Sequence, residues 1–151
     1  MGLFDKFLKK PETSSFTYSP SEHEGWIGIL MACMAADGDM DPFEIDVMAK
    51  AVALKTTFTG VDFGALLTKV MDAKNKLGAM GLVEACSKVV KETDKATLFT
   101  MAVEIVLADG SIDTEEEMVV NAVAKELNID EVIAEKIIEV MLIRNYGNLV
   151  L

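Results

Sequence analysis

The side chains best suited to chemistry in this 151-residue chain are carboxylates, which are gathered in two short segments of similar sequence. Residues 36–44 and 108–116 lie 72 positions apart, and both follow the pattern Ala-Asp-Gly-x-(Met/Ile)-Asp-x-x-Glu. Carboxylate oxygens are ligands that hard divalent cations take in proteins. We therefore expect the two segments to bind a divalent cation, with Ca²⁺, Mg²⁺, Mn²⁺ and Zn²⁺ as candidates. The expected ligands are Asp37, Asp39, Asp41, Glu44, Asp109, Asp113 and Glu116.

The same carboxylates also have a purely structural interpretation. Asp41 and Asp113 each stand where an aspartate caps the N-terminus of a following helix. Glu44 and Glu116 come three residues later, as in a capping box, where the two side chains accept from each other's backbone N–H groups. The glycine of each segment suits the end of the preceding helix, where a left-handed conformation is common. In this alternative the segments are only tight connections between helices.

Asp37 and Asp109 are the residues that the structural interpretation does not cover. Each lies at the predicted C-terminal end of a helix, where the helix dipole disfavours a carboxylate. An aspartate at this position in both segments needs an interaction that offsets the unfavourable effect of the helix dipole. Either the first N–H groups of the next helix donate to it, or it faces a bound cation.

The first segment partly matches the calcium-binding loop of an EF-hand, but the match fails at two defining positions. Position six of such a loop is a glycine and position twelve is a bidentate glutamate. The first segment has Pro42 and Met48 at these positions, and the second has Thr114 and Val120. A high-affinity calcium loop of the EF-hand type is therefore excluded.

Helices must position these segments, because apolar residues recur at helical spacing through most of the chain and strand signals are poor. The pattern predicts helices that begin at Ser21, Asp41, Asp62, about Lys76, Thr93, Asp113 and Asp130. The last helix is expected to end near Tyr146, with Gly147 as its stop. Gly78 and Gly81 are expected to mark close contact between helices. We therefore predict an all-α, compact single-domain bundle of about seven helices with two pseudo-symmetric halves.

The chain is expected to have three parts: a short amphipathic segment at residues 1–10, a flexible linker at 11–20, and the helical domain at 21–151. The first segment has one apolar side, formed by Leu3, Phe4, Phe7 and Leu8. Its other side carries three lysines, Lys6, Lys9 and Lys10. Three alternatives remain open for this segment: it lies in an anionic membrane surface, it docks onto the domain, or its helix frays.

The composition excludes several classes of protein and partner. A formal net charge of −11 repels phosphate backbones, so we expect no nucleic-acid partner. The chain has two cysteines and no disulfide framework, which indicates a reducing compartment. It shows no secretory signal and no apolar run long enough to span a membrane. We expect a cytoplasmic protein, with peripheral attachment to the inner membrane through residues 1–10 as an option.

Little in the chain supports catalysis. The single histidine, His23, is expected to be exposed, and no serine or cysteine forms a catalytic motif with it. We therefore expect no enzymatic activity. Met31 and Met34, which flank Cys33, have two interpretations: a surface that binds soft metal ions or, as we expect, part of the hydrophobic core.

The two acidic segments, each joining two helices of an acidic all-helical chain, resemble those of the TerB-like family associated with tellurite resistance. The start Met-Gly-Leu-Phe-Asp-Lys-Phe is similar to family members, and the likeness covers roughly residues 21–145. The resemblance implies a compact seven-helix fold, an intracellular location, acidic residues proposed to bind metal, and no established enzymatic activity. It also implies a stress-response system with other proteins as partners, some at the inner membrane face, and leaves the oligomeric state open. The expected function is a non-catalytic binding module; the alternative is a protein-interaction adaptor, linked to a membrane complex or a chaperone.

Overall fold

The computed structural model describes residues 16–36, 38, 40–108 and 111–148. Within these ranges the chain forms six α-helices, two short 3₁₀-helices and no strand, which confirms the all-α class. The α-helices are α2 (Glu22–Met34), α3 (Pro42–Ala53), α4 (Phe63–Ser87), α5 (Lys95–Leu107), α6 (Thr114–Glu126) and α7 (Glu131–Arg144). The 3₁₀-helices are η2 (Thr56–Phe58) and η3 (Glu92–Asp94). The predicted number of about seven helices is therefore slightly too high.

The difference in helix number comes from α4. The two helices predicted to begin at Asp62 and near Lys76 are the two halves of this one element, joined at a kink. The kink lies at Gly78, whose φ of 73° and ψ of 171° are not helical. No atom lies within 4 Å of the position that a Cβ would take at Gly78, so the predicted close contact between helices is wrong there. Glycine suits this position because of its positive φ.

The N-terminal caps of the helices largely follow the prediction. Ser21 Oγ accepts a hydrogen bond of 3.2 Å from a backbone N–H in the first turn of α2. Asp62 and Asp130 cap α4 and α7 in the same way. The cap predicted at Thr93 is wrong, because Thr93 lies inside η3 and α5 begins only at Lys95.

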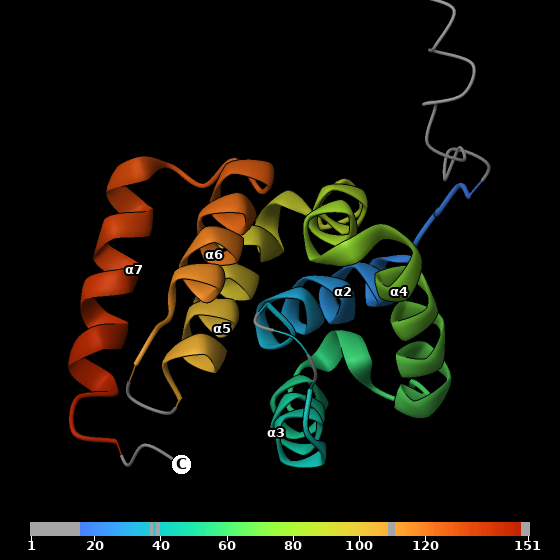
Figure 1. The fold of residues 1–151 in the computed structure, drawn as a ribbon, viewed down its shortest axis with the longest axis horizontal. Coiled ribbons are helices and arrows are strands. Elements are labelled where there is room, and N and C mark those ends of the chain that lie inside the picture. Colours follow the sequence, from blue (N-terminus) through green and yellow to red (C-terminus); the bar gives the residue numbers. More distant parts are fainter. Residues whose placement is uncertain (1–15, 37, 39, 109–110, 149–151) are drawn as a thin grey trace, which may run out of the picture.

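Helix α2 forms the centre of the fold. Every residue from Glu24 to Met34 is buried, as expected of a helix that is apolar around its whole circumference. Helix α4 lies on one side of α2 and α5 on the other (Figure 1). Two glycines, Gly25 and Gly28, allow the C-terminal end of α4 to approach α2 closely, because a Cβ at either position would overlap a neighbouring side chain.

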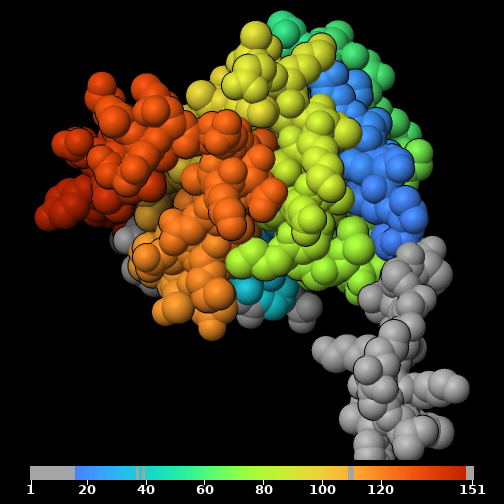
Figure 2. Space-filling view, turned by 90° about the horizontal axis from the view of Figure 1, so that it is seen from above, coloured from blue at the N-terminus to red at the C-terminus, as the bar shows by residue number. Residues whose placement is uncertain are grey.

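Helices α6 and α7 complete the bundle. Figure 2 shows α6 beside the C-terminal half of α4, with α7 at the edge of the molecule. Helix α7 packs chiefly on α5 and is followed by Gly147, whose φ of 81° agrees with its predicted role as a stop. None of the described helices is both long enough and apolar enough to cross a membrane.

The first described residues lie against the domain, although the sequence assigns them to the linker. Tyr18 Oη donates a hydrogen bond of 2.9 Å to Oε2 of Glu24 on α2. Phe16 stacks on Tyr18 at a centroid distance of 6.3 Å, and Nζ of Lys76 lies 4.4 Å from the centre of the Phe16 ring. The chain therefore enters the domain beside α2 and α4. Residues 1–15 lie outside the described ranges, so the three-part division of the chain stays a prediction.

Candidate functional site

The two acidic segments contribute to the same hollow in the surface. This hollow has a volume of about 150 Å³ and is lined by Asp41 and Glu44 of the first segment and by Glu116 of the second. The rest of its wall comes from Met34 of α2, Phe43 of α3, Ile105 and Val106 of α5, and Ala108, which directly follows α5. Three of the seven predicted ligands, drawn from both segments, are thus brought to one cavity.

Asp41 and Asp113 cap the helices that follow the two segments, as predicted. Oδ1 of Asp41 accepts a hydrogen bond of 2.8 Å from the N–H of Glu44 at the start of α3. Oδ1 of Asp113 accepts one of 2.7 Å from the N–H of Glu116, and Oε1 of Glu116 accepts one of 3.1 Å from the N–H of Asp113. This reciprocal pair is a capping box at the start of α6. Each cap bond uses one oxygen of a carboxylate that has two, so capping and cation binding do not exclude each other.

Glu116 also affects the pKa of Cys33 in α2, the central helix of the fold. Burial, together with the smaller effect of the negative charge of Glu116, raises the pKa of the Cys33 thiol on α2 to about 12. Both cysteines of the chain are free and buried. Met31 and Met34, on either side of Cys33, are buried as well, so their interpretation as part of the core is confirmed.

Asp37, Asp39 and Asp109, three further predicted ligands, lie outside the described residues. Gly38, between the first two, has a φ of 137°, which favours glycine, but it lies three residues beyond Ala35, the C-cap of α2, and so does not itself end that helix. Within the part of the chain that the structure describes, no three acidic, histidine or cysteine side chains are grouped closely enough to hold a metal ion. A cation in the hollow therefore needs at least one of these three aspartates in addition to the carboxylates that line it.

His23 is not among the residues that line the hollow. Its Nε2 lies 2.6 Å from the carbonyl oxygen of Thr57, and its ring centre lies 5.0 Å from that of Phe58. The side chain is half-buried, so its predicted exposure is wrong. The physical reason is η2, which packs over the first turn of α2 and cannot be recognised from helical periodicity alone. His23 therefore belongs to the packing of η2 on α2.

Comparison with known proteins identifies a family but no individual relative. Neither the curated proteins nor the solved structures give a match to this chain. A family model described as tellurite resistance protein TerB matches residues 19–137, a range that includes both acidic segments and the whole of α2 to α6. Domains of this family are generally non-catalytic. The chain belongs to the TerB family.

Proposed function

We propose that this TerB domain is a non-catalytic module of a tellurite-resistance or related stress response, and that it binds a divalent cation between its two acidic segments. The observation that carries the proposal is the lining of the hollow, to which the first segment contributes Asp41 and Glu44 and the second segment contributes Glu116. Carboxylates that share a small cavity repel one another, and a divalent cation between them relieves this repulsion.

The ends of two helices support the same proposal. Met34 is the last residue of α2, Ala108 directly follows the last residue of α5, and both line the hollow. The C-terminal end of a helix carries backbone carbonyl oxygens without a partner in the helix and about half a negative charge from the helix dipole. Both features favour a bound cation. They also explain why an aspartate follows α2 and α5 at a point where the dipole alone disfavours one.

The chemistry of the lining favours some cations over others. Its polar side chains are carboxylates, with no histidine or cysteine among the residues that line it. An oxygen donor set suits Ca²⁺, Mg²⁺ and Mn²⁺, whereas protein sites for Zn²⁺ usually include histidine or cysteine. We expect Asp37, Asp39 and Asp109 to supply the remaining oxygen ligands.

Thermal unfolding of the chelator-treated protein, with and without each cation, tests the proposal. A cation that binds only the folded state at a hundredfold excess over its Kd stabilises that state by about 2.7 kcal/mol. For a domain of this size, this free energy corresponds to a rise in Tm of roughly 5–10 °C. We expect such a rise with one cation and its loss in Asp37→Asn and in Asp109→Asn. A small, equal rise with every divalent cation would show mere screening of the net charge and contradict the proposal.

The second candidate function is a protein-interaction adaptor, and an exposed apolar face of α7 favours it. Val132, Val140 and Ile143 lie on one face of this helix and are 55%, 58% and 71% exposed. Exposed apolar side chains grouped on one element are typical of protein-binding surfaces. In this function the partners are other proteins of the stress-response system and the acidic segments only connect helices. The adaptor function predicts that Val140→Asp abolishes partner binding whereas Glu116→Gln leaves it unchanged.

A further inference from the structure

A second hollow continues the first along α5. It has a volume of about 290 Å³ and shares two lining residues, Ile105 and Ala108, with the acidic hollow. Its other wall is formed by Val47 and Ala51 of α3, while Phe43 and Glu44 of the same helix line the acidic hollow. Together the two hollows form one groove between α3 and α5, which we call the α3–α5 groove.

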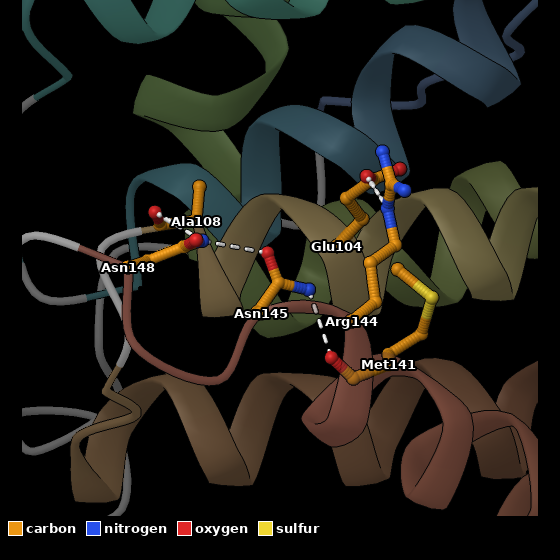
Figure 3. A network of polar contacts seen from close by, with 6 residues as sticks. All are labelled: Glu104, Ala108, Met141, Arg144, Asn145 and Asn148. Carbon is orange, nitrogen blue, oxygen red and sulfur yellow. Dashed lines mark hydrogen bonds and ion pairs between the residues drawn. The ribbon is translucent and has the colours of Figure 1, made fainter.

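Two polar residues just beyond α7, Asn145 and Asn148, line one end of this groove. Figure 3 shows the network of polar contacts to which they belong. Asn148 Nδ2 donates to the carbonyl oxygen of Ala108 at 3.2 Å and to Oδ1 of Asn145 at 2.9 Å. Arg144 Nε donates to Oε1 of Glu104 at 2.9 Å on the same side. The opposite end is acidic, because it is the hollow that both acidic segments line. The groove therefore has an apolar middle, a fixed end at α7 and a negatively charged end.

A ligand that matches this groove has apolar side chains on one face and positive charges on another. Amphipathic helices bind grooves of this kind through apolar side chains spaced three and four residues apart. Residues 1–10 of this chain have that pattern, with apolar side chains at Leu3, Phe4, Phe7 and Leu8 and lysines at Lys6, Lys9 and Lys10. These ten residues have three lysines and one aspartate, whereas the chain as a whole has a net charge of −11.

We propose that the α3–α5 groove binds residues 1–10 of a second copy of this chain. The two phenylalanines of the segment, three residues apart, bury their rings in the apolar part of the groove, and the lysines face its acidic end. The attraction between opposite charges strengthens the contact, and binding gives the short segment the partner that a ten-residue helix needs to be stable.

The position where the chain enters the domain explains why the segment comes from another copy. The first described residues lie beside α4, on the side of α2 that is away from α5 (Figure 1). Residues 11–15 span at most about 18 Å when fully extended. A globular domain of this length has a radius of gyration of about 15 Å, so its width exceeds that span. A neighbouring copy has no such restriction.

Paramagnetic NMR on a mixture of two full-length proteins tests the proposal. One is ¹⁵N-labelled wild type; the other is the unlabelled Gly2→Cys variant with a nitroxide on the introduced thiol, a position outside the apolar side of the segment. The native cysteines are buried and stay unmodified. We expect broadening of the amide signals of Val47, Ala51, Ile105 and Ala108. A nitroxide at exposed Lys69 of α4, introduced through Lys69→Cys, should not broaden these signals.

Two further variants make the result specific. Ala51→Trp fills the groove and should abolish the broadening, whereas Ala53→Trp, at an exposed position of the same helix, should preserve it. Phe4→Ser/Phe7→Ser should weaken self-association in sedimentation velocity by at least about tenfold. All samples contain chelator, so failure here leaves the cation proposal intact. Absence of broadening, broadening at α7 instead, or segment binding only to anionic lipid vesicles would overturn the proposal.

Discussion

Gly28 of α2 lies directly against the thiol of Cys86 on α4, so that a Cβ at Gly28 would overlap Sγ of Cys86. The same Cβ would lie 3.4 Å from Cδ1 of Leu82. Cys86 Sγ also donates to the carbonyl oxygen of Glu24, one turn earlier in α2, at 3.8 Å. The central helix is therefore held against α4 by a contact that only glycine permits.

We predict that Gly28→Ala destabilises the protein by about 1–3 kcal/mol, the usual cost of inserting a methyl group into a packed core. Urea unfolding measures the change. Gly64→Ala in the first turn of α4 is the matched control, because a Cβ there meets only Oδ1 of Asp62 at 3.5 Å. The control should be neutral or slightly stabilising. Equal stability of the two variants would contradict the close packing of α2 on α4.

The cap at α6 gives a second prediction, which separates capping from charge. Asp113→Ala should lower the free energy of unfolding by about 0.5–2 kcal/mol, because it removes the acceptor for the N–H of Glu116. Asp113→Asn should have a much smaller effect, since asparagine caps about as well as aspartate. Chemical unfolding in chelator measures both. An equal loss in both variants would mean that charge, rather than capping, is what Asp113 contributes to stability.

The two thiols predict how stability depends on pH. Burial raises the pKa of Cys33 and Cys86 from 9.0 to about 12 in the folded protein. The folded state therefore holds these protons more tightly than the unfolded state. The contribution of the two thiols to the free energy of unfolding is therefore fully present below pH 9. It should decrease as the pH rises from 9 towards 12.

Urea unfolding across this pH range measures the effect. The Cys33→Ala/Cys86→Ala variant should show a shallower decline than the wild type, whatever its stability at neutral pH. Tyr18, whose pKa burial and its hydrogen bond to Glu24 also raise, remains in both proteins. Identical slopes in the two proteins would contradict the inference that the thiols are protonated in the folded core.

Most helix starts could be predicted from the sequence because a cap is a local signal. Ser21, Asp41 and Asp113 act within one turn of their own helix, so residue type and spacing suffice to identify them. Thr93 carries the same signal, yet the chain forms a 3₁₀ turn there before α5 begins. Gly78 gives an ambiguous signal, because a glycine in a helical pattern fits a kink as well as a close contact.

The candidate site could be predicted only in part, because its arrangement is tertiary. The sequence indicates which carboxylates could bind a cation, but not that Asp41, Glu44 and Glu116 line one hollow. That depends on how α2, α3, α5 and α6 pack around it. The close packing of α2 on α4 was also missed from the sequence, and it depends on two glycines of α2. Their spacing, Gly25 and Gly28 one helical turn apart, is the signal that could have indicated a close approach.

Cation binding at the hollow is tested most directly by calorimetric titration of the chelator-treated full-length protein with Ca²⁺, Mg²⁺ and Mn²⁺. Three proteins are compared: wild type, Glu116→Gln, and Glu84→Gln, which removes one exposed carboxylate on α4. Glutamine at position 116 can still complete the capping box, so this variant changes the charge and preserves the cap. We predict a saturable site for one cation in wild type and Glu84→Gln, and its loss in Glu116→Gln. Weak binding that is the same in all three proteins would contradict a specific cation site.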